Sequence, residues 1–449
     1  MAKQKIQLSD HFNYSRLLRF VLPCIGTMLF TSIYGIVDGL CVSNFVGKTA
    51  FAAVNLIMPL PMLIGTVGFM LGTGGSAIVG ITLGEGDEDK ANRYFSLFVL
   101  AAFLAGVALS VLGLLILRPV AILMGAKGEM LDFAVRYGRV LMVSVPTFIL
   151  QNMFQSFFVT AEKPTLGFWF TVGAGCTNMV LDVVMVGMLH WGVEGAAVAT
   201  LISQLVGGVL PVFYFIDHRN TSRLHLCRTQ FYGRVLWDAC INGSSELMTS
   251  LSMSLVNILY NFQLLRLAGE NGVAAYGVIM YAAFLFVAVF VGYAVGSAPI
   301  VSFHYGARNH AEVHNLYQKS LRLIAVVAVS MTAVSMVLIP FVARIFVGYD
   351  TQLLALTNRA FRLYALSFLI MGFNVYASSF FTALGDGVTS ALISFLRTLL
   401  FQLAALLLLP ALWGIDGVWL AVTAAELAAL AVTVAMFLTK DKTFHYRKA

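Results

Sequence analysis

The chain repeats itself at a constant offset of 222 residues. Short matches at four separated places share this offset, whereas chance matches would scatter in offset. The matches pair 191–195 (WGVEG) with 413–417 (WGIDG), 160–161 with 382–383, 52–53 with 274–275, and Gly84 with Gly306. One constant offset indicates duplication of a half-length unit without net insertion. We therefore expect two related halves, residues 1–222 and 223–449.

The composition places both halves in a membrane. Hydrophobic residues make up 59% of the chain and charged residues 11%, whereas a soluble domain carries about 25% charge. Apolar runs of about 20 residues are long enough to span a bilayer. Twelve such runs are found, at about 16–42, 50–83, 93–117, 131–159, 166–190, 194–216, 235–265, 272–304, 318–347, 359–384, 387–411 and 414–438. These runs predict an all-α polytopic membrane protein with twelve transmembrane helices in two pseudo-symmetric six-helix lobes.

The number of spans and the basic residues predict the orientation. Six spans per half is an even number, so the repeat is parallel, with a pseudo-two-fold axis along the membrane normal, which is a transporter architecture. If both termini are cytoplasmic, eighteen of the 28 Lys and Arg residues lie on the inner side, as the positive-inside rule requires. The net charge of +7 then orients helices and meets anionic lipid headgroups, and no nucleic-acid partner is expected.

Acidic residues within the spans are the candidates for chemistry, because a charge at mid-bilayer costs on the order of 3 kcal/mol. Asp38 and Asp182 lie about 9 and 12 Å below the outer ends of spans one and five, counted at 1.5 Å per residue. Their carboxylates, with a nearby amide and hydroxyl, suit a shared proton or a sodium ion. The predicted ion-coupling site is Asp38, Asn178, Asp182 and Thr200, with Thr31 and Tyr34 as neighbours on the Asp38 helix face. A buried carboxylate satisfied by hydroxyls is the structural alternative.

The second half does not repeat this site. The equivalent positions hold Tyr260, Leu400, Ala404 and Val422, so the site is expected to be asymmetric. The second half has its own intramembrane charges, and Arg397 could pair with Glu246 or with Glu426 as a buried ion pair. Glu246 could instead face substrate. The candidate cavity residues are Asn55, Gln155, Glu246, Asn257 and Arg397.

Other motifs carry less weight. The five cysteines contain no CxxC pair, which argues against a disulfide framework or zinc site. His310 and His314 are spaced to chelate a metal, but a polar loop helix explains them at least as well. Asp87 and its acidic neighbours before Lys90 are typical of a solvated helix start. No HExxH or GxSxG motif is found, so an enzyme is not expected, and the only expected cofactor is the coupling ion.

Two stretches resemble the multidrug and toxic-compound extrusion (MATE) transporters. Residues 33–39 (IYGIVDG), followed by 46–47 (VG) and 51–55 (FAAVN), are similar to the first-helix signature of that family. Residues 178–182 (NMVLD) and 192–200 (GVEGAAVAT) resemble the fifth-to-sixth-helix signature of its prokaryotic branch.

The resemblance implies a V of two six-helix lobes in the plasma membrane of a prokaryote. It implies a monomeric antiporter that exports cationic or amphipathic organic compounds in exchange for inward protons or sodium ions, by alternating access. Ion binding in the prokaryotic branch matches Asp38, Asn178, Asp182 and Thr200. The alternative is a flippase of the same superfamily for a lipid-linked precursor or polysaccharide unit, although Arg397 is the only clear deep cation for a diphosphate.

Overall fold

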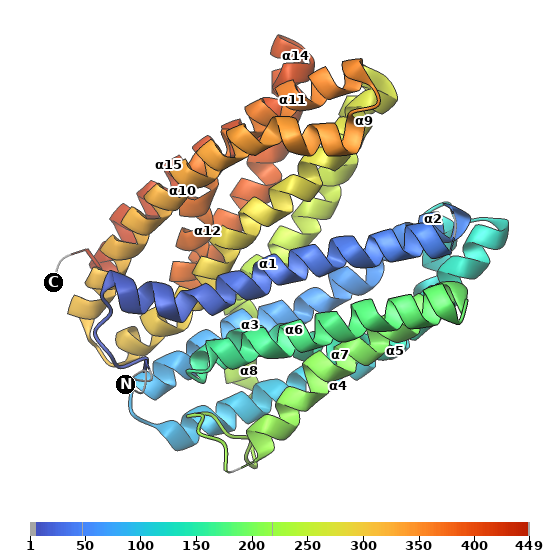
Figure 1. Cartoon of the computed structure of the whole chain (residues 1–449). Coiled ribbons are helices and arrows are strands. Elements are labelled where there is room, and N and C mark those ends of the chain that lie inside the picture. Colours follow the sequence, from blue (N-terminus) through green and yellow to red (C-terminus); the bar gives the residue numbers. More distant parts are fainter. Residues whose placement is uncertain (1–5, 47, 218, 448–449) are drawn as a thin grey trace.

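The computed structural model of the protein describes residues 6–46, 48–217 and 219–447, apart from the side chains of 36, 38–45, 48 and 51. Every regular element in these ranges is helical (Figure 1). Together with the matched solved structures reported below, this confirms the predicted all-α membrane fold.

The first lobe contains seven α-helices and one π-helical segment. Its first span is α1, and α2 leads into α3. Its fifth span continues from α6 into the π-helix η1. The bounds are α1 (Tyr14–Phe45), α2 (Lys48–Ile57), α3 (Pro59–Gly84), α4 (Glu88–Leu123), α5 (Gly128–Thr160), α6 (Pro164–Leu181), η1 (Asp182–Met188) and α7 (Gly192–Ile216).

The second lobe has a related arrangement. Its bounds are α8 (Gly233–Asn242), α9 (Ser244–Gly306), α10 (His310–Val347), α11 (Thr351–Ala365), α12 (Phe368–Ala383), α13 (Gly387–Phe395), η2 (Leu396–Leu400), α14 (Phe401–Trp413) and α15 (Ile415–Phe444). The 63 residues of α9 are interrupted at Gly269, whose φ of 60° and ψ of −150° are not helical. At 1.5 Å per residue α9 would be about 95 Å long, so it comprises two spans.

The spans agree with the sequence prediction. Ten helices in the described ranges are long and apolar enough to cross a membrane, or eleven if α11 and α12, which bend by 46° at their junction, form one span. Division of α9 at Gly269 brings the described helices to the twelve predicted spans. The predicted domain boundary at residue 222 falls in the segment between α7 and α8 and stays a prediction.

The two lobes meet at one end and diverge at the other, which gives the molecule a V shape (Figure 1). We call the end that carries both chain termini the terminal face and the opposite end the distal face. One apolar cluster near the terminal face joins both lobes and includes Phe98, Phe154, Phe303 and Phe380. Toward the distal face the second lobe has a core of its own between residues 256 and 422, and the first lobe has one between 50 and 197.

Glycines allow the two lobes to approach closely near the terminal face. A Cβ atom on Gly84 of α3 would lie 2.0 Å from the carbonyl oxygen of Phe303 in α9. A Cβ atom on Gly306 would lie 2.0 Å from the carbonyl oxygen of Ile81. Gly306 and Phe303 are the equivalents of Gly84 and Ile81 under the offset of 222 residues, so the repeat maps each contact onto the other. The pseudo-two-fold axis therefore passes between α3 and the second half of α9.

Related capping residues begin helices in both lobes. Asp87 accepts a hydrogen bond from the backbone N–H of Lys90, and Asn309, its equivalent, accepts one from the N–H of Glu312. Such caps satisfy N–H groups that the helix leaves free. Asp386 caps α13 in the same way; burial alone would raise the pKa of its carboxyl, but hydrogen bonds from Lys440 and Thr389 hold that pKa below its usual value.

Candidate functional site

Asp182 lies where the fifth span changes its helical geometry. It is the first residue of η1, and its side chain is 0% exposed. A π-helical segment widens the turn and often occurs at functional sites. Helices α1 and α7 both pack against η1, so the first and sixth spans flank the acid that the sequence predicted as an ion ligand.

Two further predicted ligands are neighbours of one another. The Asn178 side-chain amide donates to the Thr200 hydroxyl across 3.5 Å, at the outer limit of a hydrogen bond. The same hydroxyl donates to the carbonyl oxygen of Ala196 at 3.0 Å, so its lone pairs face Asn178. Asn178 lies one helical turn before Asp182, whose N–H donates to the Asn178 carbonyl. The structure thus brings α6, η1 and α7 together at this level.

The first span approaches the same place. Asp38 belongs to α1, but its side chain lies outside the described residues. One turn earlier, Tyr34 packs beside Gly175 of α6: a Cβ atom on this glycine would lie 3.2 Å from the Tyr34 ring and 2.5 Å from that of Phe30. The glycine therefore allows the predicted polar face of α1 to contact α6.

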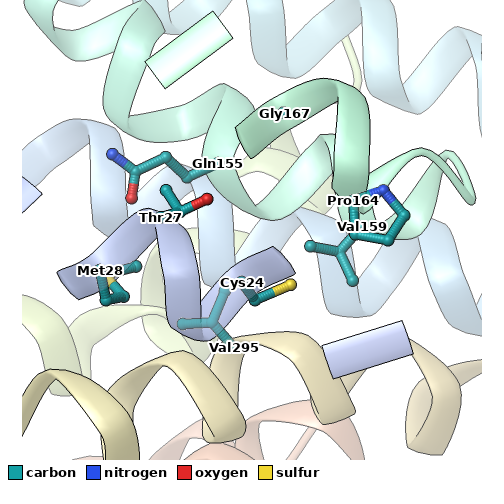
Figure 2. Close-up of a pocket in the computed structure, with 8 residues that line it drawn as sticks. All are labelled: Cys24, Thr27, Met28, Gln155, Val159, Pro164, Gly167 and Val295. Atoms are coloured by element: carbon teal, nitrogen blue, oxygen red, sulfur yellow. The ribbon is translucent and has the colours of Figure 1, made fainter. Parts of the chain in front are cut away.

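A small pocket lies about two to three turns before Tyr34 along α1, toward the terminal face. Its volume is about 10 Å³, the space of one water molecule. Thr27 of α1 and Gln155 of α5 line it side by side, and Val295 of α9 lines it from the other lobe (Figure 2). The side-chain oxygens of Gln155 and of nearby Thr31 are buried and accept no hydrogen bond within the described chain. Of the candidate cavity residues, Gln155 thus lines a pocket to which both lobes contribute.

Two other candidate cavity residues are exposed. Asn55 lies on α2 and Asn257 on the first half of α9, both with accessible side chains. Asn257 lies on a membrane-spanning helix, whereas Asn55 lies on the ten-residue helix α2 that precedes the second span.

The second lobe contains a buried charged network around Arg397. This residue lies in η2, and its guanidinium Nη1 is 3.4 Å from Oε1 of Glu426 in α15. Asn374 of α12 donates to Glu426 Oε2 at 2.7 Å and accepts from the Thr433 hydroxyl at 2.8 Å. Of the two candidate glutamates, Glu426 is the ion-pair partner of Arg397 among the described residues.

The sequence allowed Arg397 to pair with either Glu246 or Glu426, and in the structure its partner is Glu426. Sequence reasoning also assigned no role to Asn374, although an amide within an apolar span is a detectable signal. Under the 222-residue offset, Glu426 corresponds to Gln204 and Asn374 to Asn152, which are amides in the first lobe. The two lobes thus share polar positions, but the second lobe alone carries a charge pair there.

Three comparisons with known proteins agree with this architecture. The MatE family profile matches residues 23–184 and 247–406, one stretch in each lobe. The multidrug export protein MepA of Staphylococcus saprophyticus is 21% identical over 433 residues, which cover 96% of this chain and 94% of that protein. MepA of Staphylococcus aureus strain MSSA476 is 22% identical over 437 residues, with the same shares covered.

Solved structures share the fold. A MATE protein in complex with MaL6 superposes with a TM-score of 0.91 at 24% identity, over 99% of both chains. A multidrug resistance MATE family transporter of the MOP superfamily in its outward-facing conformation gives 0.91 at 23% identity, also over 99% of both chains. With the family profile matched in both lobes, the chain belongs to the MatE family of membrane transporters.

Proposed function

We propose that this protein is a secondary active antiporter that exports cationic or amphipathic organic compounds in exchange for inward protons or sodium ions. The observation that carries the proposal is the fully buried Asp182, beside the Asn178–Thr200 contact, in one lobe of a V-shaped membrane protein. Relatives named multidrug export proteins support an organic cargo.

The buried acid provides the coupling. A carboxylate in a low-dielectric site is stable when it is protonated or paired with a cation. With the lobes apart at the distal face, an ion from that side loads the first lobe at Asp38, Asn178, Asp182 and Thr200. Ion binding must differ in affinity between the two states of the transporter, because equal affinity would shift no equilibrium. The widened turn at Asp182 is where helix packing responds to loading.

Cargo binds between the lobes. Glu246 is half-buried at the start of α9, and its carboxylate is suited to attract an organic cation. The terminal face is cytoplasmic, as the basic residues predict, and the protein acts as a monomer in the plasma membrane of a prokaryote. The Arg397–Glu426 pair argues against the flippase alternative, because a guanidinium neutralised by a carboxylate is a poor ligand for a diphosphate.

Transport by purified protein in liposomes tests this proposal. Efflux of a fluorescent organic cation would be followed under an imposed sodium or proton gradient for wild type, Asp38→Asn and Asp182→Asn. Both variants are expected to fall to the rate of protein-free liposomes, because an amide neither releases a proton nor neutralises sodium. Asp132→Asn is the matched control, since Asp132 is an exposed acid near the distal end of α5.

The gradient that drives the wild type identifies the coupling ion. Full transport by folded Asp182→Asn would make the acid structural and contradict the proposed coupling. Wild-type protein that moves no organic cation under either gradient would instead contradict the proposed cargo.

A further inference from the structure

The segment 6–13, which precedes α1, connects the two lobes at the terminal face. The backbone N–H of Leu8 donates to Glu162 Oε1 of the first lobe at 2.9 Å. The backbone N–H of Phe12 donates to Glu312 Oε1 of the second lobe at 2.9 Å. The side chains of Leu8 and Phe12 are 0% exposed and belong to the apolar cluster shared by both lobes. This segment, which we call the strap, is therefore packed into the closed end of the V.

The first lobe holds the strap through a residue with an unusual backbone. Glu162 follows α5 with a φ of +59°, a left-handed conformation that glycine adopts without strain. Glycines occupy such positions after α3 and α12, at Gly86 and Gly385. The Glu162 side chain is nearly fully buried and also pairs with Arg223 at 3.3 Å. A carboxylate at this strained position serves the strap and the segment that links the lobes.

The second lobe holds the strap through one face of α10, and the His304 ring of α9 packs edge-on against Phe12. Glu312, Asn315 and Lys319 follow at intervals of three and four residues in α10, which places them in line. Glu312 Oε2 is 2.6 Å from Nδ1 of His11. Asn315 and Lys319 donate to the Phe12 carbonyl oxygen at 3.1 and 2.7 Å. Among the described residues, the four polar contacts between α10 and the strap thus involve two consecutive strap residues, His11 and Phe12.

We propose that the strap is a latch that holds the terminal face closed and detaches from α10 when that face opens. The strap runs directly into α1 and is bound by Glu162, so it stays with the first lobe when the lobes part. Parting breaks the α10 contacts and leaves Glu312 with the Asn315 amide of its own helix but without its two strap partners, which opposes opening. The latch therefore sets the equilibrium between the two states. The inference rests on the alternating access proposed above, but its test needs no knowledge of cargo or coupling ion.

Distances between spin labels on the two lobes test the latch. Labels at Asp89→Cys in α4 and Lys442→Cys in α15, both exposed, would be measured by double electron–electron resonance in a chain whose five native cysteines are replaced. Wild type is expected to give mainly one short distance. Glu312→Gln and Asn315→Ala are expected to add a longer distance and to raise its population at least several-fold. Glu85→Gln, an exposed acid near the same face whose only ion-pair partner among the described residues is Lys90, is expected to match wild type.

Two outcomes would overturn the latch. One is an unchanged distance distribution in both α10 variants, and the other is an equal change in Glu85→Gln. His11→Ala removes a strap side chain that is 67% exposed, so it covers the case in which the α10 variants fail to fold, and it is expected to add the longer distance as well. His11→Cys with Glu312→Cys, oxidised to a disulfide, is expected to lock the short distance until a reductant is added. A long distance that persists in the oxidised protein would also contradict the latch.

Discussion

At the scale of single residues, the Arg397–Glu426 pair has the clearest energetic consequence. Glu426 is 1% exposed, and removal of one partner from a buried ion pair costs about 3–5 kcal/mol because the other charge stays buried. We expect Arg397→Met to lower the free energy of unfolding by about this amount. Arg397→Met with Glu426→Gln is expected to recover most of the loss, because the glutamine still accepts from Asn374.

Denaturant unfolding of the single and double variants in detergent measures this coupling through a double-mutant cycle. Glu129→Gln, an exposed acid in the first turn of α5, is the control. If Arg397→Met unfolds like wild type but fails to transport, the pair has no structural role and its charges act on cargo.

The sequence predicted some residue contacts but could not choose others. Helix depth was enough to predict that Asn178 and Thr200 lie near one another, because the rise per residue is constant along a helix. It was not enough to choose between Glu246 and Glu426 as the partner of Arg397, since both acids lie on other helices whose rotation about their axes is set by packing. The Gly175 contact with Tyr34 was not predicted either, because close approach depends on the shapes of two helices.

At the scale of helices, the closed end of the V depends on glycines in α3 and α9. Gly84→Ala and Gly306→Ala would each place a methyl group 2.0 Å from a carbonyl oxygen of the other lobe, and the helices must move apart. We expect each change to destabilise the protein by about 1–3 kcal/mol, as overpacking does. The pseudo-symmetry predicts similar effects for both, measured as melting temperature in detergent.

Gly277→Ala is the matched control, because no atom lies within 4 Å of a Cβ there. In a helix interior this change is expected to stabilise by about 0.5–1 kcal/mol. Opposite effects of Gly84→Ala and Gly306→Ala on melting would contradict a symmetric contact.

The number and order of the spans were predictable, since length and hydropathy determine whether a helix can cross a membrane. The interruptions within spans were not. The apolar run at 387–411 contains no sequence pattern that predicts the π-helical turn of η2. The change from α-helix to π-helix at Asp182 likewise has no sequence pattern that predicts it. A widened turn is stabilised by neighbouring helices rather than by a local residue pattern.

At the scale of the whole molecule, the two halves contribute unequally to ion binding and to closure of the terminal face. All four residues of the proposed ion site lie in 1–222, whereas contacts that close the terminal face come from both halves. We expect the separately expressed half 1–222 to insert and to keep a stability that depends on sodium or pH, but to transport nothing. Co-expressed halves are expected to associate and to regain transport, because small residues at the interface favour close helix packing in lipid and Glu162 pairs with Arg223 across the two halves.

Melting curves of the isolated half across sodium concentration and pH, and efflux by the co-expressed halves, measure the two parts of this prediction. Asp182→Asn in the isolated half is the control and is expected to abolish the ion dependence. An isolated half with ion-independent melting would mean that the second lobe completes the site, and the site would then belong to the interface between the lobes. Ion-dependent melting with no recovery of transport on co-expression would instead mean that the covalent link between α7 and α8 is needed to couple loading to movement.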